Sequence, residues 1–500
     1  MKPRAVLPCI ALTTLTAVAI VAACSGVNVS LGGHGSRANV AGAGDVEVGG
    51  GGATASAGTT GGLNVGDADT IPVPCAAGEK TTISGTVFDP AGNTPLYNAV
   101  VYIPAGDLPP FHDAVACETC PDSVKATAVA LSDANGDFLL QDVPDATQVD
   151  LVVQLGKWRR KKRVNISPCR ENAVASEFTR LPRDKADGDG GADLPKIALS
   201  TGHSDALECL LRKIGVSDSE FTTNSGGGRV NLFVGCVNDD GDRFGANQFV
   251  DGTKFPSTSQ LFDTPGELNT YDMLIFSCEG HRCAKDVGIG KAIQTPDHIA
   301  QLVDFANRGG RVFLDHDHYN WLNNSNLPIE KAAQFDSMTP DGGIPDTLTT
   351  KINVDFPKGQ SFAQWLLNVK ASTTLGQLDI HTARTSVQSL SPNRAQSWIF
   401  RDQDPIGFFY FTIGTPVAVA NDDPIPTACG RVVFTDLHVN GTIVVPSSDI
   451  SDQDSPFPTG CVSPIPALTA QEKALEFMIF DLSSCVQKET DSPIPPEVVK

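Results

Sequence analysis

The clearest hydrophobic pattern of the chain lies in residues 295–319. A helix is predicted there, with Thr295 as its cap, Pro296 at its first position and Gly309 at its end. Arg311–Leu314 follows at once as a short apolar run, which predicts a buried strand fed by that helix. The apolar stripe that predicts the helix consists of Ile299, Leu302, Val303 and Ala306.

Further short apolar runs alternate with helical patterns between residues 195 and 488, and such alternation predicts a doubly wound α/β domain with a parallel sheet. An α+β subdomain is predicted to be inserted at about 320–425, where the alternation breaks. We expect Ser204 to cap the first helix, and Thr469 with Glu472 to form a capping box for the last. The five predicted strands are Ile197–Thr201, Val230–Val234, Asp272–Phe276, Val312–Leu314 and Arg431–Thr435.

Residues 79–182 show a different pattern, in which apolar and polar positions alternate over short runs such as TTISGTVFDP and QVDLVVQLG. This pattern predicts a small all-β sandwich, with Asn135-Gly136 as a hairpin turn. Residues 183–194 are acidic and glycine-rich and predict a linker, and 489–500 form a tail. The predicted fold is therefore multidomain: a small all-β sandwich followed by the α/β doubly wound parallel-sheet domain.

Two family resemblances agree with these domains. The segments around Ser84–Val87 and Asp133–Phe138 resemble the carboxypeptidase regulatory-like domain, which implies a carbohydrate-binding-like sandwich without catalysis of its own. The runs YDMLIFSCEGH, FANRGGRVFLDHDHY and GRVVFTDLH resemble the class I glutamine amidotransferase-like fold in its trehalose-utilisation-type branch. That resemblance covers roughly 195–320 and 425–485, and a fold of this class hosts unrelated functions.

The N-terminus begins with MKPRAVLPCIALTTLTAVAIVAACS, a charged start followed by a short apolar stretch and small residues. This pattern predicts a signal peptide over 1–23. Val21-Ala22-Ala23 before Cys24 resembles the bacterial lipobox, which implies diacylation of Cys24 and a membrane anchor; the alternative is an ordinary signal peptide. Ser25 favours the outer membrane of a Gram-negative cell envelope. Residues 24–78 have the composition of a flexible tether.

The net charge of −21 argues against a nucleic-acid partner. One basic run, Lys157–Arg163, surrounds Trp158. It could grip phosphate or an acidic polysaccharide, although a solvated strand and turn is the favoured interpretation. Calcium ligation by Asp187, Asp189 and Asp193 is a further, weaker alternative.

The chain has 13 cysteines, which fits an exported and oxidising location. Eleven remain beyond the signal peptide and Cys24, so at least one is expected to stay unpaired or to bond another chain. We expect Cys117-x-x-Cys120 to form a disulfide in a loop. A second disulfide is predicted between Cys429 and Cys485, and pairing of either with Cys117 or Cys120 would contradict the topology behind it.

Histidines and carboxylates follow the predicted strands, where parallel strands of an α/β sheet end at one edge and ligands bind. Five of the nine histidines fall at these ends, which predicts that they converge on one rim. The rim consists of His203, His281, His316, His318 and His438, with Glu279, Asp315, Asp317 and Asp436 beside them.

His316-x-His318 could supply two imidazoles to a divalent transition metal, with carboxylates to fix the tautomers. A metal-free ligand pocket and a purely structural rim remain open as alternatives, so no cofactor is certain. Cys278, Glu279 and His281 are the candidates for nucleophilic catalysis. Phe276 replaces the glycine of the G-x-C-x-G elbow, and the downstream His-x-Glu is absent, so amidotransferase activity is not carried over. A disulfide, perhaps with Cys283, is the favoured use of Cys278.

Two functions are compatible with the sequence. The first is a membrane-anchored, non-enzymatic lipoprotein that binds a glycan or another envelope component. The alternative is an exported metal-assisted hydrolase or sugar-processing enzyme that works at the histidine rim. Metal content separates the two, because a stoichiometric transition metal favours the enzyme.

Overall fold

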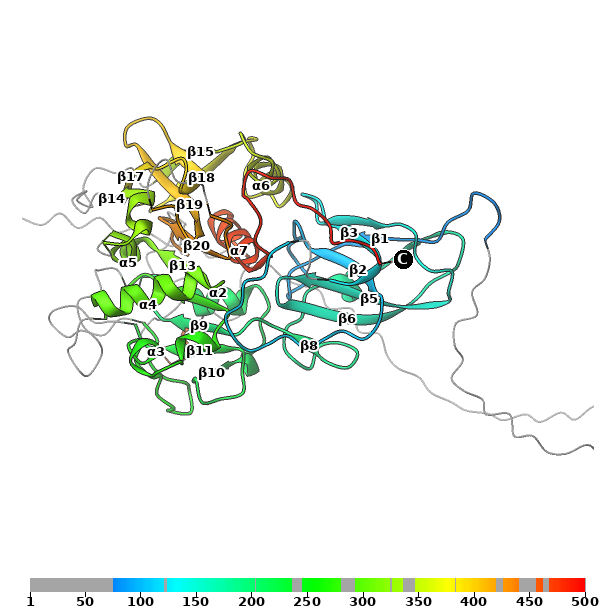
Figure 1. Ribbon diagram of the computed structural model, residues 1–500, viewed down its shortest axis with the longest axis horizontal. Helices are drawn as coiled ribbons and strands as arrows, with labels where there is room; N and C mark the ends of the chain where they lie inside the picture. Colours follow the sequence, from blue (N-terminus) through cyan, green and yellow to red (C-terminus); the bar gives the residue numbers. More distant parts are fainter. Residues whose placement is uncertain are drawn as a thin grey trace, which may run out of the picture. The chain divides into compact units, whose positions relative to one another are not determined.

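The computed structural model describes residues 75–120, 124–202, 204–235, 245–279, 293–323, 326–335, 347–382, 384–419, 426–439, 456–461 and 467–499. All of these residues belong to one compact unit (Figure 1). Cys24 and residues 1–74, with the predicted signal peptide and most of the tether, lie outside the described residues. A search of the described part of the chain finds no helix with the length and hydrophobicity needed to cross a membrane.

The N-terminal part folds into two sheets that share an apolar core. One sheet has the order β4-β1-β7 and the other the order β3-β2-β5-β6-β8. Ile83 from the first and Val153 from the second are buried in the same cluster, as expected for a sandwich. The strands are β1 (Thr82–Thr86), β2 (Val100–Pro104), β3 (Ala126–Leu131), β4 (Asp137–Leu140), β5 (Gln148–Leu155), β6 (Trp158–Asn165), β7 (Glu171–Ala173) and β8 (Ala192–Asp193).

The hairpin predicted at Asn135-Gly136 is wrong. β3 pairs with β2 and β4 pairs with β1, so this turn carries the chain from one sheet to the other. The turn itself forms as its residues require: Asp133 Oδ1 accepts from Asn135 N at 2.7 Å, and Gly136 has a φ of 77°. The residues of the turn thus predict the turn itself, but they do not determine with which strands β3 and β4 pair.

The first half of the basic run is buried and paired with acidic residues, whereas Arg163 is exposed. Arg159 lies 2.8 Å from Asp193 and Arg160 lies 3.0 Å from Asp187, and both guanidinium groups belong to largely buried residues. Both acids come from the predicted linker, which therefore packs against β6. The run is a strand, as favoured; its second half, Lys161–Arg163, is partly or fully exposed, whereas Arg159 and Arg160 are not. Asp187 and Asp193 face arginines and do not form a calcium site.

The second part of the chain is built on a ten-stranded sheet of order β10-β11-β9-β12-β13-β20-β19-β18-β15-β16 (Figure 1). The first six strands in this order run parallel, so the five strands predicted from the apolar runs are confirmed as neighbours. These six are β9 (Ile197–Ser200), β10 (Phe221–Thr222), β11 (Val230–Phe233), β12 (Met273–Phe276), β13 (Arg311–Asp315) and β20 (Gly430–Thr435).

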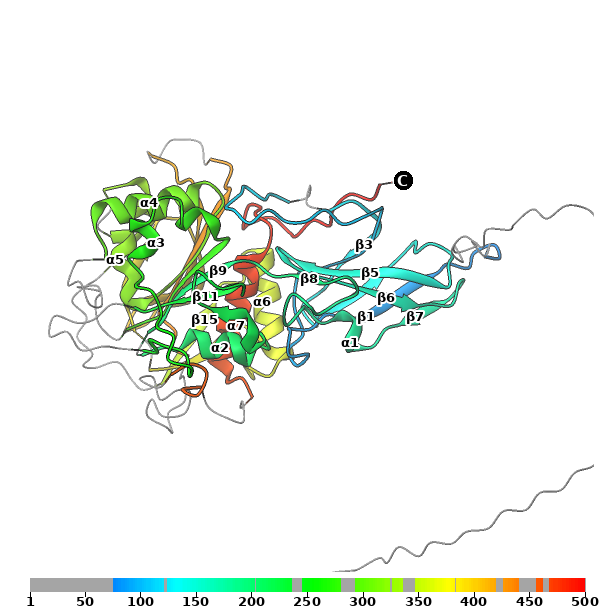
Figure 2. The ribbon, with the colours of Figure 1, turned by 90° about the horizontal axis from the view of Figure 1, so that it is seen from below.

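Helices cover both faces of this sheet, as the doubly wound prediction requires. Val433 of β20 packs in the apolar cluster that contains α2 and α7, whereas Val432 packs in the cluster that contains α4, and Figure 2 shows these helices on opposite sides. The longer helices are α2 (Leu207–Lys213), α4 (Pro296–Asn307), α6 (Pro357–Asn368) and α7 (Ala470–Ser483). The shorter ones are α1 (Ser176–Thr179), α3 (Gln260–Asp263), α5 (Asn320–Asn323), η1 (Asp218–Glu220), η2 (Leu268–Thr270), η3 (His316–Tyr319) and η4 (Pro328–Ala332).

Two of the predicted caps are confirmed. The Thr295 side chain accepts from His298 N, and Thr469 with Glu472 forms the capping box of α7. The predicted cap at Ser204 is wrong, because α2 begins two residues later than expected, with Ala206 in the cap position and no side-chain cap.

The segment at 320–425 is not a separate subdomain. It contains α6 and several strands, but four strands extend the main sheet: β19 pairs antiparallel with β20, and β18, β15 and β16 follow. Among the described strands of this segment, β14 and β17 form a small sheet of their own. The strands outside the parallel part are β14 (Ala333–Phe335), β15 (Thr347–Ile352), β16 (Gln377–His381), β17 (Val387–Leu390), β18 (Ala395–Arg401) and β19 (Gly407–Thr415).

Four disulfides are present among the described residues, and they overturn two predicted pairings. Cys429 bonds Cys117 and Cys485 bonds Cys120, so neither the Cys429–Cys485 pair nor a Cys117–Cys120 loop disulfide forms. These pairings are the outcome stated above as contradicting the topology. The parallel position of β20 and the helix α7 behind it are nevertheless as expected, so that criterion was too strict. What the prediction missed is that the segment of residues 117–120, which belongs to the sandwich part of the chain, docks at this edge. The remaining disulfides are Cys75–Cys169 and Cys209–Cys461.

The two parts also share a buried carboxyl pair, which predicts a pH effect. Burial raises the pKa of Glu476 on α7 well above its ordinary value, and the nearby Asp89 carboxylate adds to the rise. The folded state therefore keeps a proton that the unfolded chain loses above pH of about 4.5, so this group costs stability as pH rises. Glu476→Gln should unfold at higher denaturant than the wild type, with the gap widening towards about 1–3 kcal/mol at alkaline pH.

The measurement is urea unfolding at several pH values between 4 and 9. Glu177→Gln, at an exposed position, is the matched control and should leave the pH dependence unchanged. A Glu476→Gln variant whose stability follows the wild type at every pH would show that the Glu476 carboxyl is not held protonated.

Candidate functional site

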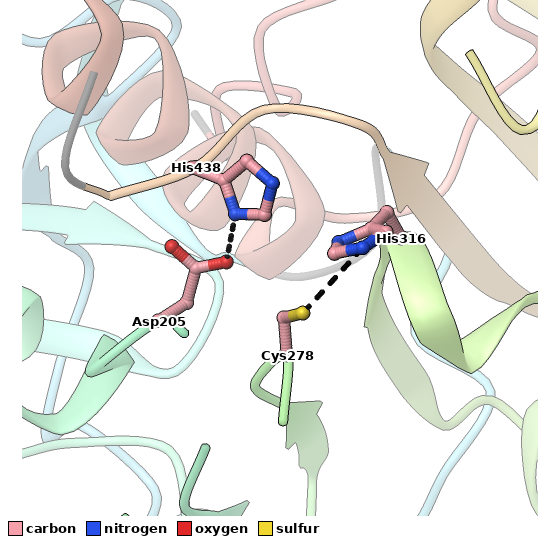
Figure 3. Close-up of side chains that lie close together, drawn as sticks. All are labelled: Asp205, Cys278, His316 and His438. Carbon is pink, nitrogen blue, oxygen red and sulfur yellow. Dashed lines mark hydrogen bonds and ion pairs between the residues drawn. The ribbon is translucent and has the colours of Figure 1, made fainter. Parts of the chain in front are cut away.

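Four potential metal-binding side chains meet at the carboxyl ends of adjacent parallel strands. Asp205 follows β9, Cys278 follows β12, His316 follows β13 and His438 follows β20 (Figure 3). One donor atom from each lies within 4.8 Å of the donors of the other three, and all four residues are buried. We call these four residues the strand-end cluster.

Asp205 and His438 are joined tightly. His438 Nδ1 and Asp205 Oδ2 share a proton across 2.6 Å, and Val439 N donates to Asp205 Oδ1 at 2.6 Å. Burial disfavours the charged form of both groups, which raises the pKa of Asp205 to about 7 and lowers that of His438 to about 4. Near neutral pH the imidazole is therefore uncharged and able to act as a ligand.

Cys278 and His316 form the other side of the cluster. Cys278 Sγ lies 3.7 Å from His316 Nε2 and 3.6 Å from Asp317 Oδ2. Burial and the charge of Asp317 raise the pKa of the Cys278 thiol well above its ordinary value. Burial alone would lower the pKa of His316, but Asp317, whose Oδ2 is 3.3 Å from Nε2, outweighs it and raises the pKa to about 9. The disulfide predicted for Cys278 is thus replaced by a thiol held beside an imidazolium.

Carboxyl groups are concentrated around the cluster. Asp315 ends β13 and Asp436 follows β20; burial raises the pKa of both carboxyl groups. Asp436 Oδ2 accepts from Ser386 N at 2.8 Å, which brings the 320–425 segment into the site. Because burial disfavours the charged form of these acids, a bound positive ion would favour their ionised form.

His318 does not join His316, contrary to prediction. Its Nε2 lies 2.9 Å from Ser277 O and 3.0 Å from Glu279 Oε2, while Nδ1 accepts from Trp321 Nε1 at 3.2 Å. The prediction assumed that residues two apart point the same way, as in a strand. The chain instead forms the 3₁₀ helix η3 from His316, so the two rings diverge.

The predicted rim is therefore found in part. His316 and His438 come together with ring centroids 4.7 Å apart, and Asp315, Asp317 and Asp436 surround them. His203 and His281 lie outside the described residues. Asp205 was missed, although it lies two residues after His203 at the same strand end, and that position was the signal that could have found it.

No family model, no curated protein and no solved structure matches this chain. The family resemblances therefore stay predictions, and function has to be argued from the site itself. What the geometry supports directly is a buried Asp/Cys/His/His cluster with the donor types and spacing to hold a metal ion.

Proposed function

We propose that the strand-end cluster binds one divalent transition metal, with zinc as the ion that fits best. The observation that carries this proposal is the convergence of one carboxylate, one thiol and two imidazoles within 4.8 Å. Thiolate and imidazole together select zinc over calcium or magnesium, which prefer oxygen ligands. The surrounding acids favour a cation of charge +2 in the same place.

The distances agree with this proposal after one small adjustment. Ligands of tetrahedral zinc lie about 2.0–2.3 Å from the metal and hence about 3.3–3.8 Å from each other. The 3.7 Å between Cys278 Sγ and His316 Nε2 already falls in that range. The 2.6 Å between Asp205 and His438 is a hydrogen bond, which would open by roughly 0.8 Å when zinc replaces its proton.

We propose further that the protein is a lipid-anchored envelope protein and binds a glycan or other surface component without catalysis. Four protein ligands fill a tetrahedral zinc ion, and filled sites are typically structural. Metal content alone therefore does not separate the two functions, and the number of protein ligands has to decide between them. In this function the metal would fix the ends of β9, β12, β13 and β20, and the sandwich would contribute binding surface. The N-terminal lipobox-like sequence and the disulfides both support an exported location.

The anchor is tested by a Cys24→Ser variant. Without the acceptor thiol, no acyl chains can be attached, and two such chains are what make anchoring stable. We expect the variant to lose labelling by a radioactive fatty acid and to move from the membrane fraction to the soluble fraction. Cys9→Ser, inside the predicted signal peptide, is the control and should keep both. Unchanged fractionation of Cys24→Ser would contradict the anchor.

A metal-assisted hydrolase is the second candidate, and the Asp205–His438 hydrogen bond favours it. If that hydrogen bond persists when the metal binds, Asp205 orients His438 and is not itself a ligand. The metal then has three protein ligands and keeps its fourth position for water. The two candidates differ in the spectrum of the cobalt-substituted protein. We expect visible bands of four-coordinate cobalt that added azide leaves unchanged; bands that shift with azide would reveal an open position and favour the hydrolase.

A further inference from the structure

A cleft lies on the outer face of the larger sandwich sheet, and it shares no lining residue with the strand-end cluster. Its empty volume, with the space at its mouth included, is about 770 Å³, within the range of clefts that bind small molecules. Leu131 of β3, Val100 of β2 and Gln154 of β5 lie opposite one another across three neighbouring strands and line its floor. The adjacent residues Val101 and Val153 are buried in the sandwich core. Because side chains alternate along a strand, the floor is the sheet face that the core does not use.

The walls of the cleft are apolar. Phe111 comes from the loop after β2, and Ile494 and Pro496 come from the C-terminal segment. Val100 and Leu131 add two aliphatic side chains from the floor. Ile494 is 57% exposed although it lines the cleft, so the cleft borders on solvent. An apolar molecule in the cleft would remove these side chains from water, which is the main favourable contribution to such binding.

The C-terminal segment that carries Ile494 is held at both ends. Before Ile494, Cys485 bonds Cys120. After it, Val499 N donates to Ala126 O at 2.8 Å, so the segment lies next to β3 (Figure 1). The cleft is therefore formed before a ligand arrives, which lowers the entropy cost of binding.

Glu118 carries the one charge among the described residues that line the cleft. Its side chain is 33% exposed, and no described residue donates a hydrogen bond to its carboxylate. Lys157 Nζ lies 3.5 Å away but donates to Asp272 Oδ1 at 2.6 Å. Its other two hydrogen bonds go to the backbone carbonyls of His112 and Ala114. Since an ammonium group has three protons to donate, the Glu118 carboxylate is left to accept from a ligand.

The charge that a ligand in the cleft meets is therefore negative. Lys157 and Arg311 line a separate, smaller cavity and not the cleft, whereas Glu118 lines both. We propose that the cleft binds a small apolar molecule with one ammonium group, such as an arylalkylamine. The apolar body would lie over Val100 and Leu131, and the ammonium group would donate to Glu118. This inference does not depend on the metal or on the lipid anchor, so its failure would leave the proposed function unchanged.

The test uses the full chain, with tryptamine as the probe and indole-3-propionate as the matched control compound. Both carry an indole ring on a two-carbon chain, and they differ in the terminal ammonium or carboxylate group. We expect tryptamine to bind about ten-fold more tightly or better, because it forms a charge-assisted hydrogen bond where the carboxylate is repelled. Calorimetric titration measures both affinities, and a soaked crystal should place the amine nitrogen within about 2.7–3.2 Å of Glu118. Equal affinities, no binding of tryptamine, or an indole ring outside the cleft would overturn the proposal.

Two variants test the two parts of the cleft separately. Glu118→Gln removes the charge and keeps the size of the side chain, so it should bind the two compounds with nearly equal affinity. Glu177→Gln makes the same change at an exposed position of α1 and should keep the preference for tryptamine. Leu131→Trp fills part of the cleft and should weaken the binding of tryptamine, while circular dichroism confirms that the variant is folded. An unchanged preference in Glu118→Gln, or unchanged affinity in folded Leu131→Trp, would overturn the proposal.

Discussion

Replacing Arg431 by Met is expected to destabilise the protein by about 3–5 kcal/mol, because it leaves buried carboxylates without their main counter-ion. Arg431 of β20 lies 2.7 Å from Glu489 and 3.1 Å from Asp481, and its side chain is 2% exposed. Lys358 of α6 contacts the same two acids at 3.2 Å and 2.5 Å. Arg431→Met would leave Lys358 to balance the buried Asp481 and the partly buried Glu489, which is the costly way to break such a network.

The measurement is urea unfolding with tryptophan fluorescence at neutral pH. Lys351→Met removes a similar cation from an ion pair with Asp402 in which both side chains are about half exposed, and it should leave the unfolding midpoint unchanged. A midpoint for Arg431→Met that matches the wild type would mean that the four charges are not buried together.

The second large effect is expected at the strand-end cluster. His316→Gln should lower zinc affinity by roughly 100-fold or more, above the 10- to 100-fold typical for residues that only support a ligand. His318→Gln makes the same change two residues away and should still bind zinc, because His318 faces Ser277 and Glu279. We expect that variant to unfold at a lower temperature instead.

Competition with a chromophoric chelator measures both affinities, and circular dichroism confirms that each variant is folded. Equal zinc affinity of His316→Gln and the wild type would remove His316 from the ligand set. Loss of zinc from His318→Gln while its fold is kept would restore the ligand pair that the sequence had predicted.

The parallel part of the fold could be predicted because each strand is a continuous apolar run with a helix or a polar segment beside it. Since such strands end at one edge, the meeting of His316 with His438 followed from chain order alone. The antiparallel extension could not be predicted in the same way. The apolar run at β19 predicts a strand but not the sheet to which the strand belongs. The antiparallel pairing of β19 with β20 places it in the main sheet.

The missing parts of the site depended on interactions that no local pattern records. Asp205 becomes a candidate ligand through its contact with His438, a residue 233 positions away. The pairing of Cys117 with Cys429 depends on a loop of the sandwich part lying against the end of the α/β domain. His318 was misplaced because one turn of 3₁₀ helix replaced the extended chain that the spacing suggested.

The central claim is tested most directly by anomalous diffraction at the zinc absorption edge, on crystals of the protein purified and dialysed after exposure to micromolar zinc. We predict one zinc ion per chain, with Asp205, Cys278, His316 and His438 as ligands at about 2.0–2.3 Å. Crystals without an anomalous peak at the strand-end cluster, or with zinc bound only by other residues, would contradict it.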